Sequence, residues 1–356
     1  MKTPKFRIGI AGLGAGQSHL KAFQELPDWF EVAAVCDIDL QKAKKVQEEN
    51  GLTVCTGQFE DLLGMDLDII DIATPSFLHH QQAMAALAAG KHVILEKPAA
   101  GSLREVDEIK RAVRQSGLLL MPIFQQRFGR GLQKLKFLLD QGIPGKPILA
   151  TAETAWRRRP EYYATWHGRW QTELGGALVT LGIHAHDQVC SVLGPPASVM
   201  AHIATLVNPI ETEDTAAISL RMRSGALASF AVTTGSSRET TRLRFCFSNL
   251  TAEGNPEPYS PSCEPWTFTG DTPQVDSQIQ EALAGFIPLP EKLTGQFHHF
   301  YQSLARGAAL PVSIADARVA VELLSAIYLS DSTQRAVDLP IPLDHPYYQS
   351  WRPQPI

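Results

Sequence analysis

The sequence predicts an α/β protein of two domains. An N-terminal doubly wound parallel sheet is expected over residues 1–124, and a C-terminal α+β domain with a large, mostly antiparallel open sheet over 125–356. Three observations support this division. The chain of 356 residues is long for one domain. Apolar runs alternate with helix-period segments up to about residue 124, and short strands of alternating pattern dominate afterwards.

In the first half, buried strands and helices follow one another as they do in right-handed βαβ units, which build a parallel sheet covered on both faces. The predicted strands are FRIGIAG (6–12), EVAAVCD (31–37), DIIDIATP (68–75), HVILEKP (92–98) and LLLMPIF (118–124). The helices begin near Ser18 and cover about 40–49, 78–90 and 102–117. Ser102 and Glu105 have the spacing of a capping box at the start of the last one.

The second half predicts an open sheet with a few helices. A helix over about 131–141 leads into a turn and a strand, and residues 197–248 alternate as strands do, with a hairpin turn at 224–225. Residues 250–275 are expected to form a long proline-rich loop. An amphipathic helix is expected over 315–336.

Composition excludes several classes of partner. The chain is 44% hydrophobic and 19% charged with a formal net charge of −5, so nucleic acid and anionic membranes are not expected partners. Its five cysteines show no CxxC spacing, which favours a reducing, cytoplasmic location over a disulfide framework or a metal site. The N-terminal apolar run is broken by glycines, and no long uncharged apolar segment follows, so neither a signal peptide nor a membrane span is expected.

The first strand runs into a glycine-rich turn, GLGAGQSH (12–19). Such a turn lets a pyrophosphate approach the backbone and the amide donors at the start of a helix, as in Rossmann folds. Gly12 and Gly14 fit the spacing G-x-G-x-x-G, whereas Gln17 occupies the third glycine position. Gly16 comes one residue early, after Ala15, so the loop is predicted to be a variant or one residue shorter.

The acid that would complete such a site is Asp37, at the end of the second strand. A carboxylate at this place binds the adenosine ribose hydroxyls and repels a 2′-phosphate. The next residues, Ile38 and Asp39, include no Arg or Ser, so NAD is favoured over NADP, with Ile38 also beside the cofactor. The alternative is that Asp37 only caps the following helix.

Charged residues end the apolar strand KHVILEKP (91–98) without an intervening turn. Ligands of doubly wound sheets bind at the carboxyl ends of the strands, which is where Glu96 and Lys97 are expected. A partly desolvated ammonium there can bind a substrate hydroxyl or relay its proton. Pro98 restricts the backbone that presents Lys97. The alternative is a strand end whose charges merely face water.

Together these segments resemble one family. GLGAG, VCD, IATPSFLH, AALAAGKHVILEKP and GGALVTLGIHAHD are similar to motifs of the glucose–fructose oxidoreductase, inositol dehydrogenase and rhizopine-catabolism (Gfo/Idh/MocA) family. The likeness covers nearly the full chain and is most specific in AGKHVILEKP. It implies that the cofactor is also lined by the turn after the third predicted strand, at Thr74, Pro75, Ser76, Leu78 and His79.

The resemblance also implies catalytic residues. Lys97 would lie near the nicotinamide and the reacting carbon, and His184 would be the acid/base. The family aspartate four residues earlier is Thr180 here, on the same helix face and toward the substrate, which puts a direct transfer of the inositol dehydrogenase mechanism in doubt. No metal is expected, because His184 and His186 diverge by about 200° around a helix.

An unusual segment, TAWRRRPEYYATWHGRWQTELGG (154–176), precedes the helix of His184. Aromatic rings stack on sugar C–H faces, and arginines bind carboxylates or phosphates in bidentate fashion. Its alternative interpretation is an exposed basic strand with core aromatics. The substrate-binding residues predicted here and in the preceding QQRFGR segment are Arg127, Arg157, Tyr163, Trp166, Arg169 and Trp170, with one of Arg157–Arg159 binding an acidic group.

The resulting hypothesis is an NAD-dependent dehydrogenase or reductase. It would move a hydride between nicotinamide and a secondary hydroxyl or keto group of a sugar, cyclic polyol or sugar derivative. Two alternatives stay open: a glycoside-cleaving enzyme with tethered NAD that works by oxidation, elimination and re-reduction, and a non-catalytic nucleotide-binding protein. The free face of the open sheet needs covering, and the resemblance implies a homodimer or homotetramer in which it is covered.

Overall fold

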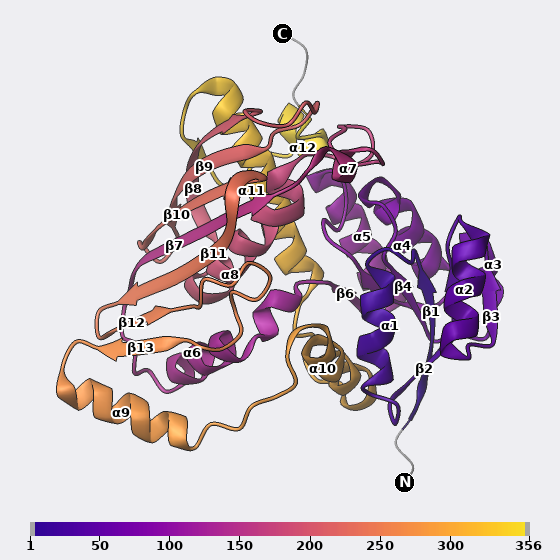
Figure 1. The fold of residues 1–356 in the computed structure, drawn as a ribbon, viewed down its shortest axis with the longest axis horizontal. Coiled ribbons are helices and arrows are strands. Elements are labelled where there is room, and N and C mark those ends of the chain that lie inside the picture. The colour runs from indigo at the N-terminus through magenta and orange to yellow at the C-terminus, as the bar shows by residue number, and fades with distance from the viewer. Residues whose placement is uncertain (1–3, 353–356) are drawn as a thin grey trace. The chain divides into compact units, whose positions relative to one another are not determined.

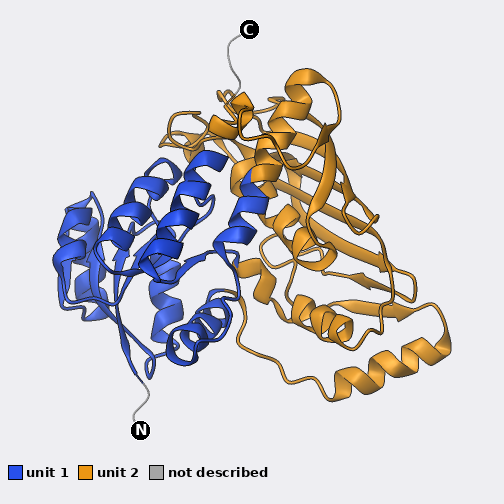
Figure 2. Cartoon of the chain, turned by 180° about the vertical axis from the view of Figure 1, so that it is seen from behind, with its two compact units in different colours: residues 1–124, 293–321 blue, residues 125–292, 322–356 orange. Residues whose placement is uncertain are grey.

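The computed structural model describes residues 4–352, and the chain divides into two compact units (Figure 2). The first comprises residues 1–124 and 293–321, and the second comprises 125–292 and 322–356. The boundary at 124/125 coincides with the one expected from the sequence. Residues 293–321 nevertheless belong to the first unit, so the second is not the contiguous 125–356 that the change of pattern suggested. Within residues 4–352, no helix has the length and apolar character needed to cross a membrane.

A six-stranded parallel sheet in the order β3-β2-β1-β4-β5-β6 forms the centre of the first unit (Figure 1). The strand order reverses between β1 and β4, which is where Rossmann folds bind their ligands. The strands are β1 Phe6–Ala11, β2 Phe30–Cys36, β3 Val54–Thr56, β4 Ile69–Ile72, β5 His92–Leu95 and β6 Leu120–Pro122. The helices are α1 Gly16–Gln24, α2 Leu40–Asn50, α3 Phe59–Gly64, α4 His79–Ala88 and α5 Leu103–Ser116, with a 3₁₀ turn, η1, at Ser76–Leu78.

Local signals explain where these helices begin and end. Ser102 accepts a hydrogen bond from the backbone N–H of Glu105 at 3.2 Å, as the capping box predicts. Gly51 and Gly117 end α2 and α5 in the left-handed conformation, with φ of 61° and 70°. The strands read as continuous apolar runs because helices cover both faces of the sheet, and Ile8, for example, is fully buried.

The returning segment packs on the first sheet through α10, Lys292–Arg306. Phe297 stacks on Phe23 of α1 with ring centroids 4.1 Å apart. The side chain of Gln296 accepts a hydrogen bond from the N–H of Phe124 and donates one to the carbonyl of Pro122. Helix α11, Ile314–Thr333, begins in the first unit and ends in the second, and it confirms the helix expected over 315–336.

The second unit is built on an eight-stranded sheet in the order β13-β12-β11-β7-β10-β9-β8-β14. All its pairs are antiparallel except β7 with β10. The strands are β7 Pro147–Arg157, β8 Pro196–Ala204, β9 Thr215–Met222, β10 Leu227–Thr233, β11 Gly235–Phe247, β12 Leu250–Glu253, β13 Thr267–Gly270 and β14 Val337–Asp338. The β9–β10 pair confirms the hairpin predicted around 224–225. The prediction of a continuous loop over 250–275 is wrong near both ends, because β12 and β13 form a strand pair there.

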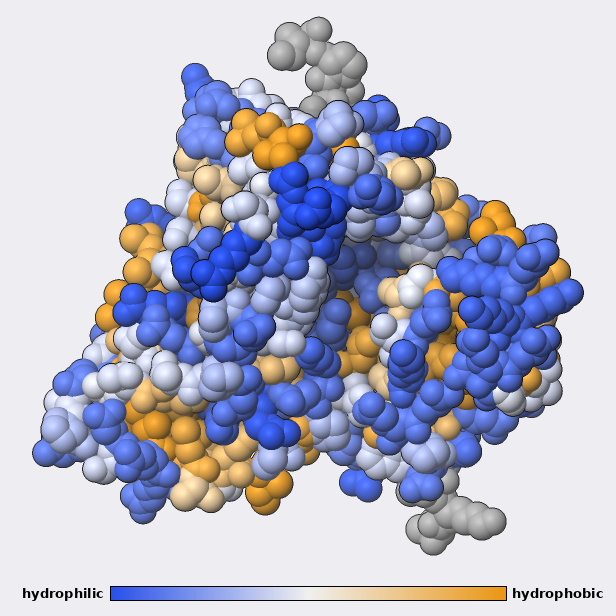
Figure 3. All heavy atoms as spheres, in the orientation of Figure 1, coloured by the Kyte–Doolittle hydropathy of each residue, from blue (hydrophilic) through white to orange (hydrophobic). Residues whose placement is uncertain are grey.

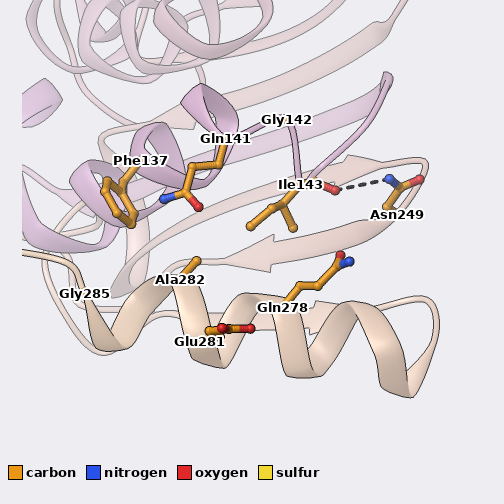
Figure 4. A pocket seen from close by; sticks show the side chains of 9 residues that line it. All are labelled: Phe137, Gln141, Gly142, Ile143, Asn249, Gln278, Glu281, Ala282 and Gly285. Atoms are coloured by element: carbon orange, nitrogen blue, oxygen red, sulfur yellow. Dashed lines mark hydrogen bonds between the residues drawn. The ribbon is translucent and has the colours of Figure 1, made fainter.

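The other elements of this unit are α6 Arg130–Asp140, α7 Pro160–Tyr163, α8 Ile183–Leu193, α9 Pro273–Ala284 and α12 Pro346–Gln349, with a 3₁₀ turn, η2, at Gln125–Phe128 and a π-helical turn, η3, at Leu178–Gly182. Figure 3 shows hydrophobic surface at the end of the unit where α9 lies. Ile287, in the segment after α9, is 82% exposed. Next to α9 lies a groove of about 600 Å³, where the side chain of Asn249 donates to the carbonyl of Ile143 (Figure 4). None of the predicted site residues lines this groove.

Candidate active site

In the first unit, the glycine-rich turn has the shape that a dinucleotide phosphate needs. Gly12 has φ of 87°, and a Cβ there would lie 2.5 Å from the carbonyl oxygen of Ala73, so only glycine fits. Gly14 is exposed, and a Cβ there would meet nothing within 4 Å, which leaves the backbone open to a ligand. Both residues precede the start of α1, whose N-terminal amides and dipole favour an anion.

Gly16 takes the part of the third glycine. A Cβ on it would lie 2.9 Å from a side-chain carbon of Ile10, so glycine is needed for close packing of α1 on β1. The turn is therefore one residue shorter than the usual spacing, which was one of the two expectations. Gln17 instead hydrogen-bonds the carbonyl of Leu13 at 2.8 Å and holds the turn from within.

Asp37 lies directly beside this turn. Its carboxylate accepts hydrogen bonds from the N–H of Leu13 at 2.8 Å and from the ammonium of Lys42 at 3.0 Å. Burial alone would raise the pKa of Asp37, but these donors and the N–H of Asp39 hold it below its usual value. Helix α2 is capped by Asp39 and not by Asp37, which removes the capping alternative. The neighbouring Ile38 is 96% exposed, free to pack against a ligand.

The turn after β4 is tied to the loop after β5 by His79. The imidazole of His79 is buried, and its two nitrogens lie 2.7 Å from the carbonyl oxygen of Pro98 and 2.8 Å from that of Thr74. Burial lowers the pKa of His79, against these two carbonyl contacts. The hydroxyl of Thr74 hydrogen-bonds Gln82 at 2.5 Å. Pro75, the buried Ser76 and Leu78 complete the turn, and their contact with a cofactor stays a prediction.

A buried network of charged side chains, which was not predicted from the sequence, adjoins Lys97 through Glu96. One ring nitrogen of His19 on α1 is 2.9 Å from a carboxylate oxygen of Asp71 in β4, and the other is 3.1 Å from Glu96 after β5. Glu96 also accepts the backbone N–H of Lys97 at 2.9 Å. Asp71 within the apolar run DIIDIA was the signal that could have revealed it, because a buried charge requires a partner.

Electrostatics favour the charged forms of His19 and Glu96. Burial would lower the pKa of His19, but Asp71 and Glu96 raise it to about 10. Burial would raise the pKa of Glu96, but the hydrogen bond and charge of His19, together with Lys97, lower it to about 2. The pKa of Asp71 is raised by its burial in spite of His19. The imidazole of His19 therefore lies between the carboxyl groups of Asp71 and Glu96, and Glu96 is followed by the half-buried Lys97, whose peptide bond to Pro98 is cis.

In the second unit, the glycine-rich segment opens a helix through a π-helical turn, η3, in place of the regular α-helix that was expected. Such turns are frequent at functional sites. Thr180 donates its hydroxyl hydrogen to the carbonyl of Gly176 at 2.9 Å. A Cβ on Gly176 would lie 1.9 Å from the carbonyl oxygen of Glu213, so this glycine permits close approach of two backbones.

The carboxylate of Glu213 holds the start of this helix. It accepts hydrogen bonds from the N–H groups of Gly176 and Leu178 and from the hydroxyl of Tyr328, at 2.8–3.0 Å. Burial raises the pKa of Glu213 to about 7, although these donors act in the opposite direction. Sequence reasoning missed Glu213, since its partners are far away along the chain.

His184 opens onto a small cavity. The cavity has a volume of about 30 Å³, enough for one water molecule, and Gln188 and Trp156 also line it. His186 points elsewhere and is buried, which lowers its pKa to about 3. Within residues 4–352, no cluster of three or more histidines, cysteines or acids could hold a metal ion.

Arg127, predicted to bind substrate, is buried in this unit. Its guanidinium makes two hydrogen bonds to the carboxylate of Asp187 on α8, at 2.6 and 2.9 Å. Such a bidentate pair fixes α8 against η2. The structure thus gives Arg127 a packing role, and contact with a substrate stays a prediction.

The arginines of the aromatic and basic segment (154–176) are of two kinds: some contact other protein groups and others are exposed. Arg157 donates to the carbonyl of Gly235 at 3.0 Å, and Arg158 lies over the rings of Trp156 and Tyr162. Arg159 and Arg169 are exposed. Of the three successive arginines, Arg159 is thus the most accessible to an acidic group.

The aromatic side chains of this segment are half-buried. Tyr163 shares a hydrogen bond with Thr234 at 2.9 Å, and the indole N–H of Trp170 donates to the carbonyl of Glu211 at 3.0 Å. Trp166 stacks on His167 with ring centroids 3.9 Å apart. The polar atoms of Tyr163 and Trp170 thus serve the fold, so the ring faces of these two residues remain for a sugar.

Two family models match the chain in succession. Residues 6–124 match the oxidoreductase family with an NAD-binding Rossmann fold. Residues 132–253 match the GFO/IDH/MocA C-terminal domain. Together the two models cover more than half of the chain.

Sequence relatives include oxidoreductases of known and unknown substrate. An uncharacterized oxidoreductase of Bacillus subtilis is 32% identical over 64% of this chain and 66% of its own length. The D-glucoside 3-dehydrogenase of Escherichia coli is 30% identical over 57% of this chain and 58% of its own length. The matched regions thus span less than two thirds of either relative.

Solved structures agree along more of the chain. The WlbA dehydrogenase of Bordetella pertussis, solved with NADH and UDP-GlcNAcA, is 27% identical, covers 95% of this chain and 100% of its own, and gives a TM-score of 0.83. A levoglucosan dehydrogenase bound to NADH gives a TM-score of 0.82 over 95% of this chain and 100% of its own, at 20% identity, and supports the fold alone.

Proposed function

Because the chain belongs to the Gfo/Idh/MocA oxidoreductase family, we propose that it is an NAD-dependent dehydrogenase or reductase of a sugar, cyclic polyol or sugar derivative. The observation that carries the proposal lies within the first unit. The glycine turn, Asp37 and Lys97 all lie at the carboxyl edge of one parallel sheet, at its change of strand order. Bound NAD would supply a hydride acceptor for a secondary alcohol.

The chain's own groups would handle the proton. As a neutral amine, Lys97 would accept a hydrogen bond from the substrate hydroxyl and take its proton as the C–H bond breaks, and the resulting ammonium would stabilise the oxyanion. His184 would assist as a second acid/base, with Thr180 beside it in place of the family aspartate. Arg159 or Arg169 would bind an acidic group, and Tyr163, Trp166 and Trp170 would stack on the sugar.

The relatives suggest which substrates to test first. One curated relative is a D-glucoside dehydrogenase, and one structural relative was solved with a nucleotide-linked uronic acid. Exposed Arg159 and Arg169 favour an acidic substrate over a neutral polyol. We therefore place uronic acids and nucleotide-linked uronic acids at the head of the panel, before glycosides and inositols.

The proposal is tested by absorbance at 340 nm with NAD⁺ and each member of this panel. NADH formation with one group of substrates is the expected result. Release of an aglycone without net NADH would replace the proposal with the glycoside-cleaving alternative. A protein that binds NADH yet turns over no substrate across the panel would support the non-catalytic alternative.

We also propose that the protein acts as a homodimer or homotetramer in the cytoplasm, the location favoured by its cysteine pattern. The sheet of the second unit supports the proposed oligomer. Its strands alternate between buried and exposed residues, so one face of the sheet is open. That face includes apolar side chains such as Leu149 and Leu227, which are 37% and 49% exposed.

Sedimentation velocity checks the assembly. The wild-type chain is expected to sediment as a dimer or tetramer, and Leu227→Asp is expected to shift it toward the monomer by placing a charge in a desolvated interface. Leu206→Asp is the matched control, since Leu206 is 70% exposed and lies outside the strands. A monomeric wild type would contradict the proposal.

A further inference from the structure

Lys42 lies at the acid expected to bind the adenosine ribose. It belongs to the first turn of α2, and its ammonium is 3.0 Å from the Oδ2 atom of Asp37. The same oxygen accepts the N–H of Leu13 in the glycine turn at 2.8 Å. The side chain of Lys42 is 38% exposed and that of Asp37 is 11% exposed, so the cation stands on the open side of the pair.

This arrangement changes the meaning of the strand-ending acid. A lone carboxylate at this place binds the ribose hydroxyls of NAD and repels the 2′-phosphate of NADP. Here the ammonium balances the charge of Asp37. An ammonium has three donors, of which Asp37 takes one in this contact, so others can turn to a phosphate oxygen.

The surroundings do not restore the repulsion. The next acid along the chain, Asp39, accepts hydrogen bonds from the N–H groups of Gln41 and Lys42, where it caps α2. A 2′-phosphate would therefore meet the ammonium of Lys42 next to a carboxylate whose charge that ammonium balances.

We infer that Lys42 is a specificity-determining residue that lets this site bind NADP(H) alongside NAD(H). The residues that fit the dinucleotide are those of the glycine turn, already described, and Lys42 adds tolerance for the 2′-phosphate. This inference rests on dinucleotide binding and is independent of the sugar that the protein oxidises.

The test measures binding directly, by titrating the protein with NADH and with NADPH and following nucleotide fluorescence. In the wild type, the two dissociation constants are expected to lie within roughly ten-fold of each other. In Lys42→Met, NADPH is expected to bind roughly ten-fold or more weakly, whereas NADH binding is unchanged or tighter. The wild-type affinity for NADPH should also fall more steeply with salt than that for NADH.

Lys45→Met is the matched control, because Lys45 is on the same helix, is exposed and pairs with Glu49. It removes the same net charge without touching Asp37. Asp37→Asn provides a second variant. It is expected to weaken the binding of NADH more than the binding of NADPH.

The inference would be overturned if the ratio of the NADPH and NADH dissociation constants were the same in Lys42→Met as in Lys45→Met. A wild type that binds NADH alone would also overturn it. A wild type that binds neither nucleotide would overturn both this inference and the proposed function. A silent sugar panel with intact binding of both nucleotides would affect only the proposed function.

Discussion

Replacing Lys97 with alanine is expected to lower kcat by roughly 10²- to 10⁴-fold, the range typical of a lost general acid or base. The physical reason is that Lys97 is the lysine just after the end of β5, at the carboxyl edge of the sheet, and the variant leaves no amine at this position. Binding of NADH should survive, because the glycine turn and Asp37, which we propose to bind the dinucleotide, keep their geometry without Lys97. Steady-state kinetics on the substrate found in the panel and nucleotide fluorescence measure the two effects.

Two variants distinguish proton transfer from charge. Lys97→Arg keeps the positive charge but holds its proton far more tightly, so it should rescue little of the lost turnover. Lys44→Ala removes an exposed lysine of the same unit and should leave kcat unchanged. Wild-type turnover in Lys97→Ala would sink the proposed role and shift attention to His184.

Replacing His19 with glutamine is expected to destabilise the first unit by about 3–5 kcal/mol, the usual cost of removing one partner from a buried ion pair. The imidazolium of His19 is buried between Asp71 and Glu96, and without it two carboxylates remain in the core with no cation between them. Urea unfolding at pH 6 measures the loss. His80→Gln is the matched control, since His80 pairs with Glu108 where both side chains are 26% exposed, and it should cost about 1 kcal/mol or less.

The same network predicts how stability depends on pH. The pKa of His19 is raised from 6.5 to about 10 in the folded chain, so its contribution is fully present below pH 6.5 and is lost as the pH rises toward 10. The pKa of Glu96 is lowered from 4.5 to about 2, so its contribution is present above pH 4.5 and is lost as the pH falls toward 2. Stability from these two groups should therefore be greatest between pH 4.5 and 6.5.

A series of urea denaturations from pH 6 to 10 checks the alkaline limb. The wild type is expected to lose stability steadily over this range, and His19→Gln is expected to lose much less, because the titrating group is absent. If the free energy of unfolding of His19→Gln fell with pH as steeply as that of the wild type, His19 would not be the group responsible for the alkaline loss. Asp71→Asn offers an independent check, since removing the Asp71 charge should lower the pKa of His19 in the folded chain and therefore the pH at which the loss is complete.

Features formed by neighbours in the chain were predictable from the sequence alone. The strand–turn–helix pattern, the glycines at 12, 14 and 16, the strand-ending Asp37 and the Lys97 segment were all visible as short motifs. Backbone conformation and hydrophobic period are local properties, so the parallel sheet and the β9–β10 hairpin followed from them and were confirmed. The same local logic failed over 250–275, where proline content concealed the pairing of β12 with β13.

Only the tertiary structure decided which charged groups meet. His19 and its partners Asp71 and Glu96 are 52 and 77 residues apart, and Arg127 and Asp187 are 60 apart. The return of α10 to the first sheet likewise depends on contacts such as Phe297 with Phe23. Local patterns say that a residue such as Asp71 is buried but not which partner stabilises its charge. That depends on the order of strands in the sheet, since the order sets which strand ends and helices become neighbours.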